Sequence, residues 1–127
     1  MAALPFPYYD GYEAEQYAFY RIPKLMLEDE RFRGVSTDAL LLYGLLLDRM
    51  TLSRKNGWMD ENGHLFIYYT ADEIMAKLHC RSEKAAKLMA ELDCKKGIGL
   101  IERVSHGQGK PTMIYVKKFS GLPPPER

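Results

Sequence analysis

The sequence predicts an α+β domain in which helices precede a small antiparallel sheet. Residues 70–97, TADEIMAKLHCRSEKAAKLMAELDCKKG, hold two short runs whose apolar residues recur every three and four positions, as in amphipathic helices. Two strand-like runs, 100–104 and 112–118, follow at once around the loop SHGQGKP. With the helix that starts at Ser36, this order is typical of a winged helix-turn-helix: a three-helix core, a small antiparallel sheet and a β-hairpin wing.

Composition limits the class of protein before any motif does. A chain of 127 residues with 46% hydrophobic content has enough apolar surface for one domain with a single core. No apolar run reaches membrane-spanning length and no secretory signal opens the chain, so no membrane partner is expected. Both cysteines, Cys80 and Cys94, fall in predicted helical stretches, which favours a reducing compartment and a cytoplasmic protein.

We expect three segments along the chain. Residues 1–16, rich in acids and aromatics, predict a flexible lead, and their tyrosines leave open a contact with a partner. Residues 17–119 form the winged-helix domain. It begins with a short strand at 17–23 and a helical turn anchored by Leu25, Leu27 and Phe32. Residues 120–127, with three consecutive prolines, predict a linker leading onward.

The clearest long helix is predicted from Ser36 to Thr51. Ser36 is a good N-cap and Asp38 suits the positive helix start. Its apolar residues lie nearly all round, which predicts burial on more than one side: Leu40, Leu41, Leu42, Tyr43, Leu45, Leu46 and Leu47. The second side would face either another copy of the chain or the N-terminal segment, and the residues leave both open.

A connector of about twenty residues follows the long helix. Asn56-Gly57 and Asn62-Gly63 are turn signals. Trp58 between them is expected to pack, and Arg54 and Lys55 are expected on the connector near a phosphate backbone. Residues 65–69 are apolar and aromatic, which predicts a strand leading into Thr70.

Thr70 and Glu73 fit a capping box at the start of the first helix of the pair, predicted at 71–78. The second helix is predicted at 82–96 and ended by Gly97. The inward positions are apolar: Ala71, Ile74, Met75, Leu78, Ala85, Leu88, Met89 and Leu92. The outward positions of the second helix are mainly polar or basic, with Glu83 and Glu91 as acidic exceptions.

Charge is segregated along a chain whose formal net charge is only +1. Between residues 95 and 118 only Glu102 is acidic, so a basic face is expected there. A recognition helix enters the major groove with its N-terminal part foremost, while a wing reaches the backbone or minor groove. These considerations nominate the following DNA-binding residues: Arg81, Ser82, Lys84, Lys87, Lys95, Lys96, Arg103, His106, Gln108, Lys110, Lys117, Arg54 and Lys55. The alternative is a solvated hairpin with no ligand.

Several blocks recur here in the order found in one known family. They are FYRIPK at 19–24, STDALLLYGLLLDRMTLSRKNGW at 36–58, and KKGIGLIERVSHGQGKPTMIYVKKF at 95–119. The chain resembles the N-terminal domain of the RepA-type (RepA_N family) plasmid replication initiators of low-GC Gram-positive bacteria. The resemblance implies a dimeric winged-helix domain that binds repeated double-stranded sites at a plasmid or mobile-element origin. It also implies a C-terminal domain that contacts host replication proteins. The family usually places a hydroxyl residue directly after the turn cysteine, whereas here Arg81 comes before Ser82.

An enzyme is not expected. His64, His79 and His106 fall on separate predicted elements with no metal-ligand spacing, and GQGK lacks the spacing of a phosphate loop, so no metal or cofactor is predicted. Two binding alternatives stay open: a winged-helix transcriptional regulator using the same contacts on an operator, and a protein-interaction winged helix within a replication complex.

Overall fold

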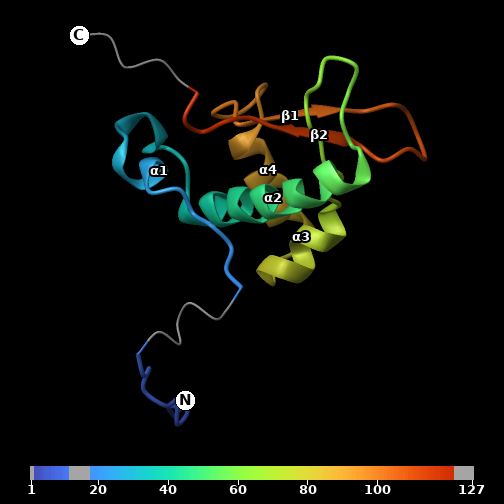
Figure 1. The fold of residues 1–127 in the computed structure, drawn as a ribbon. Helices are drawn as coiled ribbons and strands as arrows, with labels where there is room; N and C mark the ends of the chain where they lie inside the picture. Colours follow the sequence, from blue (N-terminus) through green and yellow to red (C-terminus); the bar gives the residue numbers. More distant parts are fainter. Residues whose placement is uncertain (1, 12–17, 122–127) are drawn as a thin grey trace.

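The computed structural model describes residues 2–11 and 18–121 of the chain, and its arrangement is the winged helix-turn-helix that the sequence predicts (Figure 1). The elements are α1 (Leu25–Glu28), the 3-10 helix η2 (Glu30–Phe32), α2 (Thr37–Asn56), α3 (Ala71–Leu78), α4 (Ser82–Leu92), β1 (Ile101–Val104) and β2 (Met113–Val116). Helix α2 runs through the middle and packs against α4 and β2. Residues 2–11 of the expected lead are exposed and contain no helix or strand, while most of the expected linker lies outside the described residues.

Helix α2 begins and ends at local signals. The Ser36 hydroxyl accepts a hydrogen bond from the Ala39 amide at 3.2 Å, and Gly57 ends the helix in the left-handed conformation with φ of 69°. The prediction that it ends at Thr51 was five residues too short, because no helix breaker occurs before Asn56-Gly57. Arg54 and Lys55 therefore lie in the last helical turn and not on a connector.

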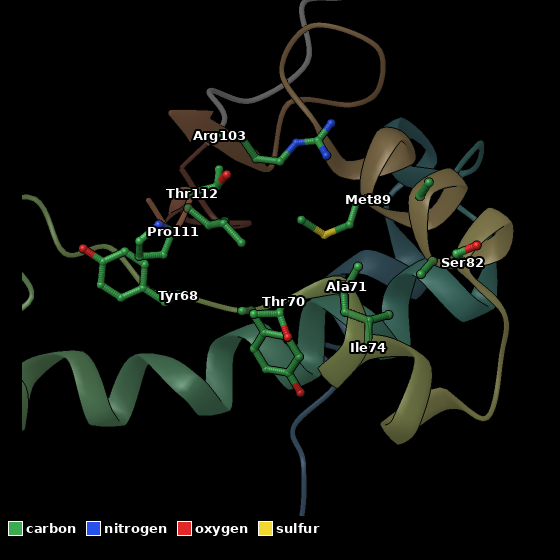
Figure 2. A pocket seen from close by; sticks show the side chains of 13 residues that line it. Tyr68, Thr70, Ala71, Ile74, Ser82, Met89, Arg103, Pro111 and Thr112 are labelled. Atoms are coloured by element: carbon green, nitrogen blue, oxygen red, sulfur yellow. The ribbon is translucent and has the colours of Figure 1, made fainter. Parts of the chain in front are cut away.

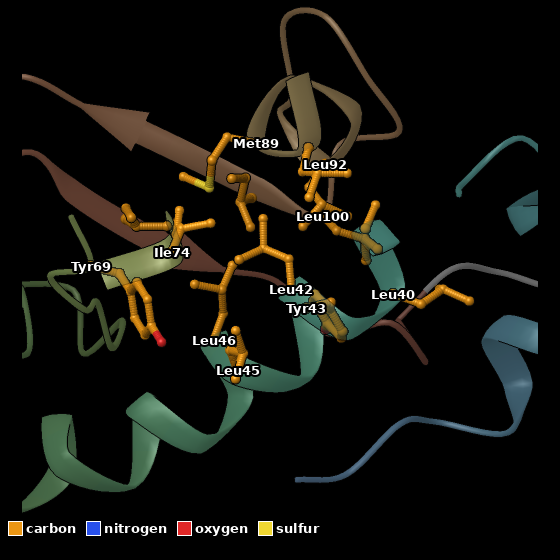
Figure 3. Packing of buried hydrophobic residues seen from close by; sticks show 14 of the residues in the cluster. Leu40, Leu42, Tyr43, Leu45, Leu46, Tyr69, Ile74, Met89, Leu92 and Leu100 are labelled. Carbon is orange, nitrogen blue, oxygen red and sulfur yellow. The ribbon is translucent and has the colours of Figure 1, made fainter. Parts of the chain in front are cut away.

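The core lies where α2, α3, α4 and the sheet meet (Figure 3). From α2 it takes Leu42, Tyr43 and Leu46, each with no exposed surface. It is completed by Ile67, Ile74, Leu88, Leu92, Leu100, Ile101 and Ile114, all at most 6% exposed. The near-continuous apolar run of α2 is therefore largely core, although Leu41 remains 48% exposed.

The N-terminal segment crosses α2 at Gly44. A Cβ at this position would lie 2.8 Å from Ile22 Cδ1 and 3.0 Å from the Arg21 carbonyl oxygen, so glycine permits a close approach of two backbones. The segment thus covers part of the second apolar side of α2. The strand predicted at 17–23 is wrong for the described residues 18–23, because they lie across a helix with no strand to pair with.

Of the three apolar anchors predicted for the first helical turn, Phe32 is confirmed, whereas Leu25 and Leu27 are wrong. Met26 and Phe32 are buried, whereas Leu25 is 39% and Leu27 66% exposed. In a helix of only four residues one position faces the core, and here that position is Met26.

Helices α3 and α4 form the predicted helix-turn-helix. The Thr70 hydroxyl accepts from the Glu73 amide at 3.1 Å and the Glu73 carboxylate accepts from the Thr70 amide at 2.8 Å, which confirms the capping box. His79 ends α3 in the left-handed region with φ of 53°, which histidine tolerates better than most side chains. This tight turn allows α4 to begin three residues later.

Helix α4 ends at Leu92, four residues before the predicted Lys96, because Asp93 is extended and bridges Ile101 of β1. Gly97 does not stop the helix. It packs beneath the helix end, where a Cβ would lie 2.0 Å from the Glu91 carbonyl oxygen and 2.3 Å from that of Ala90. The chain therefore folds back on α4 before entering the hairpin.

Strands β1 and β2 pair antiparallel, as the sequence predicts, and in the observed register Ile101 lies opposite Val116 and Val104 opposite Met113. The strand predicted at 65–69 is reduced to isolated bridges, in which Ile67 exchanges two backbone hydrogen bonds with Ile114 at 2.8 and 2.9 Å and Leu65 pairs with Met59. Pairing stops there because the chain turns into the Thr70 cap. Trp58 packs edge-on against Tyr68, as expected of a packing residue.

Candidate nucleic-acid interface

The outer face of α4 presents the polar residues that the sequence assigns to it. Arg81, Ser82, Lys84 and Lys87 are all exposed, while Ala85, Leu88, Met89 and Leu92 of the same helix are buried. Arg81 is the N-cap residue but its side chain makes no capping hydrogen bond, and Ser82 is the first helical residue. The cationic side chains at this end of α4 are thus presented toward solvent.

Lys84 forms a salt bridge with a residue of α2. Its ammonium lies 2.7 Å from Asp38 Oδ2, and this hydrogen bond raises the pKa of Lys84. Both side chains are about half exposed, so the pair stays accessible to a competing anion. A DNA contact by Lys84 would have to replace this pair.

Glu91 points inward toward α2, and the sequence interpretation of it as an outward acidic residue is wrong. Its carboxylate accepts from the Ser36 amide at 2.9 Å and from the Ser36 hydroxyl at 2.8 Å. The glutamate of an ordinary capping box stands three residues after the cap, where α2 has Ala39. The absence of a glutamate at this position was the available signal that the Ser36 amide needs another acceptor. Glu91 of α4 is that acceptor.

The hairpin loop carries His106, Gln108 and Lys110, all exposed. Gly107 and Gly109 have φ of 104° and 78°, which explains why glycine occupies both positions of this turn. The His106 ring nitrogen lies 2.8 Å from the Met113 sulfur, and Lys117 Nζ lies 3.9 Å from Glu102. The structure thus brings three of the nominated residues together at one loop.

Arg103 lies in a groove between α4 and the hairpin and not at the wing tip (Figure 2). This helix–wing groove has a volume of about 340 Å³. Its lining comes from α3, α4, the hairpin and the segment before α3: Tyr68, Tyr69, Thr70, Ala71, Ile74, Ser82, Ala85, Ala86, Met89, Arg103, Pro111, Thr112 and Ile114. Ser82 and Arg103 are the two nominated residues that share it.

Asp93 is a buried residue that forms an ion pair with Arg103. It is 4% exposed, and its carboxylate accepts from Arg103 Nε at 3.3 Å and from the Lys95 amide at 3.3 Å. Burial alone would raise the pKa of Asp93, but the hydrogen bonds from Arg103 and Lys95 outweigh it and the pKa is lowered. The sequence interpretation gave Asp93 no role, because nothing local links it to a residue ten positions later.

The remaining nominated residues are dispersed. Lys95 and Lys96 are exposed just after α4. Arg54 and Lys55 lie in the last turn of α2, about 24 Å along the helix axis from Asp38, the partner of Lys84. The structure therefore does not bring Arg54 and Lys55 together with the start of α4.

Among residues 2–11 and 18–121, no three His, Cys, Asp or Glu side chains gather as a metal site would require. Within the same residues no helix is long and apolar enough to cross a membrane. Cys80 is half-buried against the core, Cys94 is exposed, and both are free thiols.

Comparisons with known proteins agree with this fold. A structure described as the N-terminal domain of a DNA-binding protein has a TM-score of 0.71 and 32% identity, covering 89% of this chain and 84% of that one. A structure of a Rep–DNA complex has the same TM-score and identity, with 88% and 84% covered. A structure of an MDR initiator has a TM-score of 0.67 and 28% identity, with 88% and 86% covered.

A 41 kDa protein of Lactobacillus helveticus is 29% identical over an alignment of 104 residues, and the match covers 77% of this chain. The chain spans only 29% of the length of that relative. The family model described as the replication initiator protein A (RepA) N-terminus matches residues 18–124, which include every element of the fold. The chain therefore belongs to the family of replication initiator protein A N-terminal domains.

Proposed function

We propose that this domain binds double-stranded DNA in a sequence-specific manner at the repeated sites of a plasmid or mobile-element replication origin. Family membership and the 32% identity to the chain in a Rep–DNA complex support the proposal. The observation that carries it is the exposed face of α4, whose first turns present Arg81, Ser82, Lys84 and Lys87 beside a cationic hairpin.

In this proposal α4 enters the major groove with Arg81 and Ser82 foremost, where a helix fits and base edges carry a distinct donor and acceptor pattern. The small side chain of Ala86, exposed on the same helix, allows a close approach. The loop with His106, Gln108 and Lys110 would contact the backbone or the minor groove, and the contacts to phosphate would set position more than sequence.

We propose that the domain binds DNA in the cytoplasm, does not catalyse a reaction and needs no cofactor. His64, His79 and His106 lie in three separate connecting segments, which supports this proposal. The domain would act as a homodimer, supported by apolar side chains left exposed on its N-terminal half, among them Phe19, Leu27 and Leu41. Contacts with host replication proteins would be made by a C-terminal region of the whole initiator.

The test is a titration of the purified 127-residue chain with duplexes taken from the DNA upstream of its own gene, against scrambled duplexes of equal composition. We expect at least one upstream segment to bind more than about tenfold tighter than its scrambled form, a difference of about 1.4 kcal/mol. Equal binding to all duplexes would remove the sequence-specific part of the proposal. Absence of binding to any duplex would favour the protein-interaction alternative.

A further inference from the structure

We propose that the helix–wing groove seats one sugar–phosphate segment of the DNA backbone, with Arg103 as a fixed phosphate ligand and Asp93 as the residue that positions it. The inference rests on the proposed DNA-binding function and assigns a place and a ligand within it.

The first argument is topological. The major and minor grooves of a duplex are separated by a single sugar–phosphate ridge. If α4 occupies the major groove and the hairpin reaches the minor groove, the ridge between them must pass between α4 and the hairpin. The helix–wing groove is the hollow at that position, bounded by α4 on one side and by the hairpin on the other (Figure 2).

The second argument is chemical. The walls of the groove offer apolar surface for sugars, from Ala86, Met89 and Pro111, and hydroxyl donors for phosphate oxygens, from Ser82 and Thr112. Arg103 is the cationic residue of the lining. A mixed surface with one cation matches a deoxyribose–phosphate unit, which is apolar at the sugar and carries one negative charge at the phosphate.

The third argument is the orientation of Arg103. Its Nε–H is directed at Asp93 Oδ1, whereas no hydrogen bond is found for its two terminal amino groups within residues 2–11 and 18–121. A guanidinium whose Nε–H is hydrogen-bonded keeps its two terminal amino groups in a fixed plane. In that plane the amino groups can donate two hydrogen bonds to the oxygens of one phosphate. The exposed lysines of the wing have no comparable support.

The fourth argument is the position of Asp93. A carboxylate that is only 4% exposed is costly unless it is paired, and its partners are the Arg103 side chain and the Lys95 amide. Asp93 directly follows α4 and also forms a backbone bridge to Ile101 of β1. It therefore joins the end of the recognition helix to the strand that bears Arg103, and sets the guanidinium at a fixed place in the groove.

The experiment is a phosphate scan on the upstream duplex that the unmodified chain binds best. Single phosphates are replaced one at a time by neutral methylphosphonates, and the dissociation constant is measured for the unmodified chain and for Arg103→Ala. We expect Arg103→Ala to bind about tenfold or more weakly and to lower the salt slope by about one. We also expect at least one phosphate position where the methylphosphonate weakens DNA binding by the unmodified chain but not by Arg103→Ala.

Asp93→Asn tests the positioning role in a double-mutant cycle. If Asp93 acts through Arg103, the substitution weakens DNA binding in the parent and changes it little in Arg103→Ala. A purely structural role would lower thermal stability and weaken binding equally in both backgrounds. Arg103→Lys, which keeps the charge and loses the planar fork, is expected to recover only part of the affinity.

Arg33→Ala is the charge-matched control, because Arg33 is 80% exposed and pairs with Glu30 in the N-terminal half. It should leave the phosphate pattern unchanged. The inference is overturned if Arg103→Ala retains the full phosphate pattern of the parent, or if the effect of Asp93→Asn is independent of Arg103. Normal cognate binding by these variants would overturn the inference and leave the proposed function intact, whereas absence of binding by the parent would overturn the function itself.

Discussion

Lys84 forms a salt bridge with Asp38 in the absence of DNA, so replacing Lys84 removes this salt bridge as well as any contact with DNA. We expect Lys84→Ala to weaken binding to the cognate duplex by about 5- to 150-fold and binding to scrambled DNA less, because the proposed docking of α4 would bring this residue near base edges. The measurement is a fluorescence titration with both duplexes.

Asp38→Asn is the matched variant, since it releases Lys84 without removing it. It should tighten binding to all duplexes by a few-fold, because one anion is lost and one cation is freed. A Lys84→Ala chain that separates cognate from scrambled DNA as well as the parent would show that this side chain does not read sequence.

Glu73 makes the start of α3 sensitive to acid. The hydrogen bond from Arg49 and that from the Thr70 amide lower the pKa of Glu73 below its ordinary value of 4.5. Since the folded pKa is the lower one, this stabilisation is complete above about pH 4.5 and is lost as the pH falls through the folded pKa.

We predict that Glu73→Gln reduces the free energy of unfolding at pH 7 by about 0.5–1 kcal/mol, a modest value because the side chain is 40% exposed. The difference from the parent should shrink between pH 7 and pH 3, because the stabilisation that depends on the charged carboxylate is lost as the pH falls through the folded pKa. Urea unfolding at both pH values measures it, and an equal difference at both would contradict the prediction.

Two caps in this chain show what sequence reasoning can and cannot find at the residue scale. The Thr70–Glu73 box was predictable because both partners lie within one helical turn. The Ser36–Glu91 pair spans 55 positions and depends on how α4 docks on α2. The local sequence shows only that Ser36 lacks a capping-box glutamate at Ala39, and does not show which residue takes its place. The same holds for Asp93 and Arg103, which meet only because the chain folds back after α4.

At the scale of elements, the hairpin is expected to act through charge and not through base reading. Lys110 is exposed at the loop, and no ion pair of its side chain is found in the described part of the chain. Lys110→Ala should weaken binding to cognate and scrambled duplexes alike and lower the salt slope by about one.

Lys117→Ala should behave in the same way, although Glu102 lies 3.9 Å from that lysine. Binding constants measured between 50 and 200 mM salt give the slope. Lys24→Ala, an exposed lysine of the N-terminal half, is the control and should leave the slope unchanged. A loss confined to the cognate duplex would instead mean that the hairpin reads bases.

The crossing of the N-terminal segment over α2 gives a second prediction at this scale. In an open helix, Gly→Ala stabilises by about 1 kcal/mol. At Gly44 the added methyl would meet Ile22 and the Arg21 carbonyl, so we expect Gly44→Ala to destabilise by about 1–3 kcal/mol.

Gly34→Ala is the matched control, because a Cβ there meets nothing within 4 Å. It should be neutral or slightly stabilising in the same urea unfolding experiment. A Gly44→Ala chain more stable than its parent would show that the segment does not rest on α2 in solution.

The elements themselves were predicted better at their starts than at their ends. Helix starts follow Ser36, Thr70 and the turn at His79, which are local signals. The end of α4 was missed because Asp93 leaves the helix to bridge Ile101, and the strand at 65–69 was overestimated because only Ile67 finds a partner in β2. Both outcomes depend on tertiary contacts.

At the scale of the whole molecule, the open question of the second apolar side of α2 is partly answered. The N-terminal segment covers the helix at Gly44, yet Leu41 is 48%, Phe19 67% and Leu27 66% exposed. Exposed apolar groups of this size are typical of association surfaces when they are contiguous.

We predict a homodimer of about 29 kDa, twice the 14.6 kDa of the chain. Sedimentation of the free chain and of its DNA complex measures it, and Leu41→Lys should shift the equilibrium toward the monomer. One protomer per isolated site in both states would count against the dimer.

The cap shared by Ser36 and Glu91 has a consequence for the order of folding. Helix α3 carries both partners of its capping box within its own sequence, whereas the Ser36 amide at the start of α2 finds its acceptor only when α4 docks. An opening that separates α4 from α2 would therefore release the Ser36 amide to hydrogen exchange, while the Ala39 amide keeps its hydrogen bond to the Ser36 hydroxyl. The start of the longest helix of the domain is thus coupled to the docking of the helix proposed to read DNA through one side chain, Glu91.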